Sequence, residues 1–319
     1  MDFFYVFGKM VELFAIIIIG YITCKCGVFG KEARVHVTKL VLYVAIPGLT
    51  LASVLNQDSL PGRAEIFGLL LVAFSSYLVL FAGAFLIPKL LRVKREEVGI
   101  YQFMVAFANV GFIGYPVTQA IFGDRAIFYT CVFNLPFNFF AFSIGVIFIQ
   151  RSAAAMSGQA GAKVGSAISG KTFLTPCMIC SVLAIILALG GWRGPAALGE
   201  TCQMVGNITT PAALMVIGSS LAEMPVKEMF SNGKVYLFSL FRLLILPIIV
   251  YYIYGSFVTD PLLLGVCVII AAMPVATNGT MLCLQYNADE KLMAQGTFIT
   301  TLASLVTIPL LAMLFRYPQ

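Results

Sequence analysis

Residues 107–119 read FANVGFIGYPVTQ, and they lie within an apolar run long enough to cross a membrane. Asn109 is followed closely by Gly111, Gly114 and Pro116, and glycine and proline both weaken a helix. In hydrocarbon no water satisfies the backbone groups that a helix break leaves unpaired, and each such group costs several kcal/mol. A break is therefore tolerated only where protein or a water-filled cavity covers it. The stretch predicts a broken helix that does more than span the bilayer.

The composition is that of an integral membrane protein. Of the 319 residues, 60% are hydrophobic and 11% are charged, with a mean hydropathy of +0.97. Soluble domains carry about 45–50% apolar and about 25% charged residues. At about 20 apolar residues per helix, the chain has room for about ten spans. The first apolar run lacks a signal-peptide cleavage pattern, so we expect it to be retained.

Charges and turn residues divide the chain into ten expected helices of an all-α polytopic membrane protein. The expected ranges are 5–24, 37–55, 65–90, 99–122, 126–149, 173–191, 199–222, 234–256, 261–285 and 292–314. The polar segment 151–171 separates two sets of five. We therefore expect a five-helix repeat over 1–150, a cytoplasmic linker over 151–171 and a second repeat over 172–319.

The two sets of five are interrupted at matching places. Pro47 and Pro211 interrupt the second helix of each set, and NVGFIGYP (109–116) and PVATNG (274–279) interrupt the fourth. A duplicated five-helix unit enters the membrane the second time from the opposite side, and paired Gly/Pro-interrupted spans indicate the binding site of such inverted-repeat transporters. The alternative is that these residues only kink membrane helices, where proline and glycine are common.

The lysines and arginines predict the orientation. The loops after the odd-numbered helices hold 14 of the 20, the opposite side holds 5, and Arg242 lies within a helix. Because these residues are enriched on the cytoplasmic side, both termini are predicted to be extracytoplasmic. The net charge of +6 then reflects cytoplasmic loops, and no nucleic-acid partner is expected.

Several segments carry a family pattern in the same order along the chain. They are GYITCKCGVF (20–29), YVAIPGL (43–49), ANVGFIGYPVTQAIFGDRA (108–126), FRLLILP (241–247) and AAMPVATNGTMLCLQYNADEKLMAQGTFITTLASLVTIPLLAML (271–314). Together they resemble the auxin efflux carrier family, within the group that includes the bile-acid/sodium symporters. Asn287 is a departure, because the family often has glycine in this turn.

The resemblance implies a ten-span secondary transporter that works by alternating access. A scaffold of spans 1, 2, 6 and 7 would support a mobile transport domain of spans 3–5 and 8–10. Members of the family move organic anions, with auxin in plants and dicarboxylates such as malate in bacteria. The short central loop favours a bacterial-type carboxylate transporter in the cell membrane, driven by protons or sodium. A homodimer through spans 2 and 7, surrounded by membrane lipid, is also implied.

The fourth and ninth helices are expected to cross near the bilayer midplane, and their interruptions supply the candidate site. Free N–H groups and positive helix ends suit an anion, whereas carbonyl ends suit a cation. Asn134 and Asn138 share one face of the fifth helix, where they either line the same cavity or bond to neighbouring helices. The candidate substrate-binding residues at the interruptions are Asn109, Gly111, Gly114, Tyr115, Pro116, Pro274, Ala276, Thr277, Asn278 and Gly279.

Charged and amide residues elsewhere in the spans are candidates for ion coupling. Glu12, Gln102 and Gln285 are the three that we consider. Glu12 and Arg242 are ionisable, and charges within spans indicate function by default. The alternative is that Glu12 extends its side chain to the outer interface and Arg242 extends to the cytoplasmic one.

Other motifs give no competing function. GSAISGKT (165–172) matches a phosphate loop but lacks the strand before it and the soluble helix after it, so no nucleotide is expected. Cys177-x-x-Cys180 lies in an apolar run and the chain has a single histidine, so no metal or other cofactor is expected. Without HExxH or a triad, the chain is not expected to be an enzyme. A channel and a membrane sensor that shares the fold are the alternatives to a transporter.

The predicted orientation can be tested by cysteine labelling in intact cells. In a variant without native cysteines, an impermeant reagent should label a cysteine at position 317 but not one at position 160. The reverse pattern would contradict extracytoplasmic termini.

Overall fold

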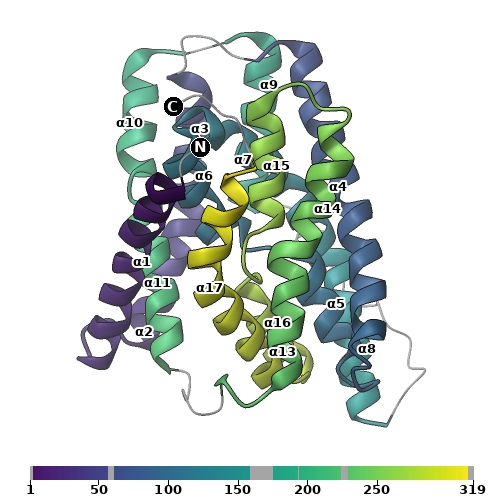
Figure 1. Ribbon diagram of the computed structural model, residues 1–319. Helices are drawn as coiled ribbons and strands as arrows, with labels where there is room; N and C mark the ends of the chain where they lie inside the picture. The colour runs from purple at the N-terminus through teal and green to yellow at the C-terminus, as the bar shows by residue number, and fades with distance from the viewer. Residues whose placement is uncertain (1–2, 57–60, 159–174, 193, 224–228, 315–319) are drawn as a thin grey trace.

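The computed structural model describes residues 3–56, 61–158, 175–192, 194–223 and 229–314. These residues form helices and no named strand, and one isolated backbone bridge joins Ala108 to Val275. Figure 1 shows the helices side by side in one bundle. They are α1 (Phe3–Lys25), α2 (Lys31–Leu40), α3 (Ile46–Leu55), α4 (Arg63–Leu90), α5 (Val98–Ala106), α6 (Tyr115–Phe122), α7 (Arg125–Phe140), α8 (Val146–Met156), α9 (Pro176–Gly190), α10 (Ala196–Gly206), α11 (Thr209–Glu223), α13 (Gly233–Leu240), α14 (Leu246–Gly255), α15 (Pro261–Ala271), α16 (Asn278–Tyr286) and α17 (Glu290–Ala312).

Several of these helices join into longer apolar segments. Within the described ranges, seven helical segments are long and apolar enough to cross a membrane, and three shorter apolar helices accompany them. Each expected range contains helix, but the fourth and ninth are broken, at 107–109 and 272–277. The fifth continues to Met156, past the expected start of the linker, because Ala153–Ala155 favour helix.

In the described residues, four π-helical turns lie near prolines of the long segments. η1 (Val41–Ala45), η2 (Val110–Gly114) and η5 (Phe241–Ile245) each end shortly before a proline, and η3 (Ala141–Gly145) follows one. Proline cannot donate to the carbonyl four residues earlier, and its ring clashes with that carbonyl. A widened turn relieves the clash, which is why π-turns accompany helix bends.

The first two helices of one expected repeat pack against the first two of the other. α1 packs along α11, and α3 packs against α9 and α10. The first pair is very close: a Cβ on Gly20 would lie 2.4 Å from the carbonyl oxygen of Met215, and one on Gly218 would lie 1.9 Å from that of Ile17. Small residues allow membrane helices to approach in this way.

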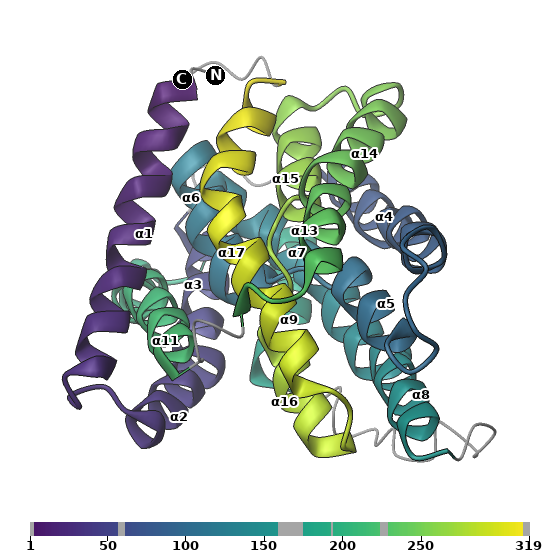
Figure 2. The same cartoon turned by 60° about the horizontal axis from the view of Figure 1, so that its bottom comes forward.

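A second group of helices surrounds the two breaks. α4, α5 and α8 pack together, α14 packs on α15, and α17 packs on α13 and α16. Figure 2 shows α17 between α1 on one side and α14 and α15 on the other. The yellow α17 therefore contacts both groups.

The first helix begins and the last helix ends at the same end of the bundle (Figure 2). At the opposite end Arg34 of α2 forms an ion pair with Glu223 of α11, and its guanidinium donates to the carbonyl of Ser219 at 3.2 Å. Positions 160 and 317 and all of GSAISGKT (165–172) lie outside the described residues.

The turn that departs from the family pattern has a clear geometry. Asn287 has φ 57° and ψ 39°, the left-handed conformation that follows the last turn of α16. Asparagine tolerates this conformation better than other non-glycine residues. Asp289 then caps α17 by accepting from the amide of Leu292 at 3.0 Å. Asparagine thus fills the role that glycine usually has at this position.

The close contact between α1 and α11 predicts a sharp difference between two glycines of α1. Gly20→Ala places a methyl group against the Met215 backbone and should destabilise the protein by about 1–3 kcal/mol. Gly8→Ala is the matched control, because nothing lies within 4 Å of its added Cβ. It should be neutral or more stable by up to about 1 kcal/mol. Thermal unfolding in one detergent at one scan rate compares them, and equal midpoints would contradict the contact.

Candidate functional site

The two helix breaks are paired with each other through their backbones. The amide of Asn109 donates to the carbonyl of Pro274 at 2.8 Å, and the amide of Ala276 donates to the carbonyl of Phe107 at 3.1 Å. These two bonds make the antiparallel bridge between Ala108 and Val275. Each break supplies hydrogen-bond partners for backbone groups of the other, so extended backbone is tolerated within the hydrophobic interior. The structure thus brings the two interruptions together, as the sequence predicted.

Side chains complete the cover around this crossing. The amide of Val275 donates to the hydroxyl of Thr300 on α17 at 3.1 Å, and that hydroxyl donates to the carbonyl of Gly296 at 2.6 Å. The ring of Phe107 lies 4.8 Å from that of Phe103 and 6.2 Å from that of Tyr77, centroid to centroid. Protein therefore surrounds the broken backbone on both sides.

Asn109 precedes η2, where the helix resumes after the first break, and one of its two side-chain amide atoms has no hydrogen-bond partner. The side chain is 3% exposed, and its Oδ1 accepts from the amide of Phe112 at 3.2 Å. Its Nδ2 is buried and has no hydrogen-bond partner. Buried polar groups are normally bonded, so an orphaned donor needs an explanation, and a ligand is one.

Asn278 is in the equivalent position at the start of α16. Its Oδ1 is likewise buried without a partner. The next residue, Gly279, allows the close approach of neighbouring side chains, because a Cβ there would lie 2.7 Å from Met293 Sδ and from Phe103 Cε1. Ala276 and Thr277 link Asn278 to the backbone bridge at Val275. Of the four residues 276–279, Ala276 and Gly279 are buried, and Thr277 and Asn278 are half-buried.

The other candidates of the fourth segment have different surroundings. Gly111 is half-buried, and the nearest side chain is Ile46 of α3, 4.0 Å from a Cβ added at Gly111. Gly114 packs within its own segment, and Pro116 lies in the first turn of α6. Tyr115 is fully buried, and its hydroxyl lies 3.5 Å from Thr50 Oγ1 on α3. Tyr115 therefore joins the broken segment to the neighbouring helix group.

Asn134 and Asn138 bond to protein atoms. Asn134 Nδ2 donates to Cys177 Sγ on α9 at 3.2 Å, and Asn138 Nδ2 donates to the backbone carbonyl of Asn134 at 2.8 Å. Asn134 thus bonds to a neighbouring helix, whereas Asn138 bonds within α7. Asn134 and Tyr115 both connect the helices around the breaks to the helices packed on α3.

The ion-coupling candidates do not gather at the crossing. Glu12 is exposed and pairs with Lys9, whose Nζ lies 3.0 Å from Glu12 Oε2. Gln285 is exposed near the end of α16, whereas Gln102 is buried in α5. The sequence suggested these residues because they are polar within spans, but polarity alone does not show which face of a helix they occupy.

Arg242 was a candidate either for a functional charge within a span or for extension to the cytoplasmic interface. Its side chain is fully buried, so it does not extend to the cytoplasmic interface. Its Nε donates to the carbonyl of Met104 at 3.2 Å, and its Nη1 donates to the carbonyl of Ala271. These carbonyls belong to the ends of α5 and α15, immediately before the two breaks. An intramembrane charge was the signal in the sequence, but its partners lie far away in the chain.

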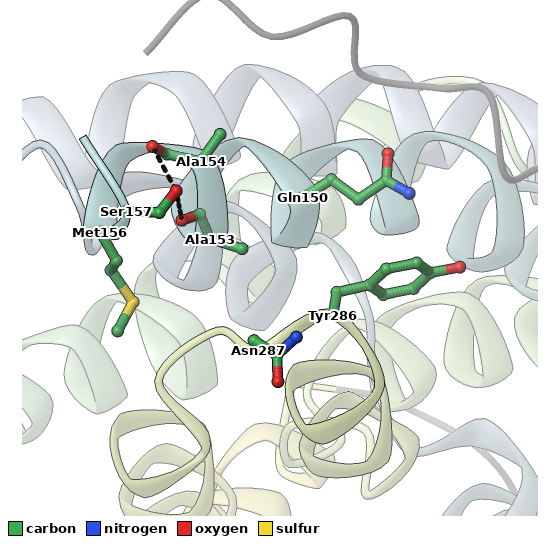
Figure 3. Close-up of a pocket in the computed structure, with 7 residues that line it drawn as sticks. All are labelled: Gln150, Ala153, Ala154, Met156, Ser157, Tyr286 and Asn287. Atoms are coloured by element: carbon green, nitrogen blue, oxygen red, sulfur yellow. Dashed lines mark hydrogen bonds between the residues drawn. The ribbon is translucent and has the colours of Figure 1, made fainter. Parts of the chain in front are cut away.

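A separate hollow of about 490 Å³ lies between the C-terminal ends of α8 and α16 (Figure 3). It is lined by the ends of α8 and α16, among them Gln150, Ser157, Tyr286 and Asn287. Ser157 bonds to its own helix, to the carbonyls of Ala153 and Ala154 (Figure 3). None of the residues at the crossing lines this hollow.

Comparison with known proteins gives consistent matches over the full length. The sequence model of a family described as membrane transport protein matches residues 5–312. An uncharacterized transporter of Methanothermobacter thermautotrophicus is 26% identical, with 94% of this chain and 95% of that protein covered. A Rhizobium meliloti protein that is named provisionally as a malonate transporter is 24% identical, covering 97% and 95%. The uncharacterized transporter YfdV of Escherichia coli is 22% identical, covering 95% of each.

The hydrogen bond from Val275 to Thr300 can be tested with another matched pair of variants. Thr300→Val leaves the buried amide of Val275 without its partner and should cost about 1–3 kcal/mol. Thr301→Val removes a hydroxyl that is equally buried, but that hydroxyl bonds only to the carbonyl of Thr297 in its own helix. Thermal unfolding should therefore show a clearly lower midpoint for Thr300→Val than for Thr301→Val. Equal midpoints would show that Thr300 does not support the crossing.

Proposed function

We propose that this chain, which belongs to the membrane transport protein family of auxin efflux carriers, is a secondary active transporter of a small organic anion. The crossing of the two broken segments is the observation that carries the proposal. It offers unpaired polar atoms of Asn109 and Asn278 in an otherwise apolar bundle. A protein that only needed stability would have no use for orphaned amide atoms there.

The chemistry of the crossing favours an anion. η2, which continues into α6, and α16 both begin at the crossing, so the positive ends of these two half-helices lie in this region. Asn109 Nδ2 adds a donor. Carboxylates accept several such hydrogen bonds, and bonds to a charged group are stronger than neutral ones. The provisional malonate assignment of the Rhizobium meliloti relative supports small dicarboxylates as the first substrates to test.

We further propose that the chain forms ten spans in two inverted five-helix repeats, with both termini extracytoplasmic. The matching breaks and the backbone bridge between them support this arrangement. The close packing of α1 on α11 and of α3 on α9 and α10 supports a scaffold of spans 1, 2, 6 and 7. The remaining spans would carry the crossing as the mobile domain, and a homodimer would form through spans 2 and 7.

Alternating access then requires the crossing to move past the scaffold. Among the described residues, two polar contacts that join the helix groups near the site are Tyr115 with Thr50 and Asn134 with Cys177. Both involve neutral groups, so they can break and re-form at modest cost. Movement of the intact crossing would expose the bound anion first to one side of the membrane and then to the other, coupled to an ion gradient.

Counterflow in proteoliposomes tests the proposal directly. External unlabelled malonate should accelerate the exit of labelled malonate from liposomes that contain the protein, and malate and acetate define the chain length and charge required. A channel would conduct without this acceleration, and a sensor would bind without any flux. Either result would contradict the transporter.

Variants of Asn109 separate substrate binding from helix capping. Asn109→Asp keeps an oxygen that can accept from Phe112 but replaces the unpartnered donor with a negative charge. Asn109→Ala removes both atoms. Loss of one hydrogen bond to a charged group costs about 1.5–3 kcal/mol, so malonate affinity should fall roughly ten- to a hundredfold in Asn109→Ala and at least as far in Asn109→Asp. Thermal stability should fall less in Asn109→Asp than in Asn109→Ala.

Asn278→Ala should weaken malonate binding in the same way. Asn207→Ala is the control, because this exposed side chain at the end of α10 accepts only from Gln203, at 2.8 Å. Binding is measured by isothermal titration in detergent. If all the Asn109 and Asn278 variants bind like the wild type, the crossing is a structural kink and the site lies elsewhere.

A further inference from the structure

Arg242 donates to the two backbone carbonyls that lose their helical hydrogen-bond donors at the breaks. In an unbroken helix the carbonyl of Met104 would accept from the amide of residue 108, and that of Ala271 would accept from the amide of residue 275. Ala108 and Val275 are the two residues of the backbone bridge, and the amide of Val275 donates instead to Thr300. Arg242 donates to the carbonyls of both Met104 and Ala271. One guanidinium thus replaces the missing donor of each broken helix.

These carbonyls form a place that suits a cation. The ends of α5 and α15 are the negative ends of two helix dipoles, and both meet at Arg242. Unwound carbonyls and half-helix C-terminal ends are the groups that coordinate a sodium ion in broken-helix transporters. Arginine stays protonated in proteins, so its charge is present at every physiological pH. Among the described residues, no carboxylate forms an ion pair with it.

We propose that Arg242 is a tethered cation that occupies the position of a coupling sodium ion at the crossing. The chain then supplies the positive charge itself. That charge offsets the negative ends of the two helices and balances an anionic substrate at the opposite half-helices. Substrate binding therefore needs no sodium. Nη2 of Arg242, which is buried without a partner, leaves donors available in this region. The part of this inference that concerns substrate binding rests on the proposed function, whereas the part that concerns stability does not.

The stability arm uses chemical rescue and needs no substrate. Arg242→Ala removes the donors of both carbonyls and leaves a space of guanidinium shape. Its unfolding midpoint should fall, and guanidinium chloride at about 10 mM, too dilute to denature, should restore a large part of the loss by binding in that space. Urea at the same concentration is the neutral control. Lys234→Ala, which alters an exposed cation bonded to the carbonyl of Arg92, should show no rescue.

Two further variants separate charge from hydrogen bonding. Arg242→Gln keeps donors without a charge, and Arg242→Lys keeps the charge on a single ammonium. If the cation is what the crossing needs, Arg242→Lys should be closer to the wild type in stability than Arg242→Gln. The opposite order, or rescue of Arg242→Ala by urea as well as by guanidinium, would overturn the tethered-cation role.

The substrate arm compares malonate binding in sodium and in choline buffers. The wild type should bind equally in both, and Arg242→Gln should bind roughly ten- to a hundredfold more weakly, which corresponds to the loss of about 1.5–3 kcal/mol from a charged interaction. A wild type that binds only in sodium would overturn the inference while leaving the transporter intact. If no carboxylate binds to the wild type, the proposed function fails, and the rescue experiment still decides the role of Arg242.

Discussion

Two backbone hydrogen bonds between the interrupted segments are the constraint on which the rest of the structure depends. They run from Asn109 to Pro274 and from Ala276 to Phe107. Neither interruption could exist alone in a hydrocarbon environment, because each would leave unpaired amides and carbonyls. Paired, they form a short extended crossing inside a helical bundle. The helices around it are then required to be close, since every remaining backbone group must also find a partner.

The remaining groups are satisfied by side chains from helices that are distant in sequence. Thr300 of α17 accepts from the amide of Val275, and Arg242 donates to the carbonyls before both breaks. Asn109 caps the turn that follows its own break. Among the buried side-chain atoms at the crossing, Asn109 Nδ2, Asn278 Oδ1 and Arg242 Nη2 have no hydrogen-bond partner. In a low dielectric such leftover donors and acceptors are costly, which makes them informative about a ligand.

Packing around the crossing combines a very close helix pair with neutral contacts. The pair α1 and α11 meets at Gly20 and Gly218, where no side chain could be inserted without moving backbone. Nearer the crossing, Tyr115 and Asn134 make neutral polar contacts with Thr50 and Cys177, within a cluster of buried apolar side chains. Under the proposed function, the close pair would belong to the scaffold and the crossing to a moving unit. The charge of Arg242 would then travel with the anion.

Much of the fold was determined by the sequence itself. Hydropathy and charge predicted a membrane protein and the helical ranges, and the Gly, Pro and Asn residues of 107–119 and 274–279 predicted both breaks, because these signals are local properties of the chain. The order of these motifs along the chain also predicted the family correctly. The exchange of glycine for Asn287 could be tolerated because asparagine accepts the left-handed turn.

Tertiary structure alone decided which atoms at the crossing are bonded and which are free. For Arg242 the sequence left open a functional role within the span or extension to the cytoplasmic face, and in the structure it is fully buried against Met104 and Ala271. The sequence treated Glu12 and Gln285 in the same way as Gln102, although only Gln102 is buried. The physical reason is that a side chain's partner is a property of several helices at once. Residues 104, 242, 271 and 300 meet only after the bundle has assembled, and no local pattern records that meeting.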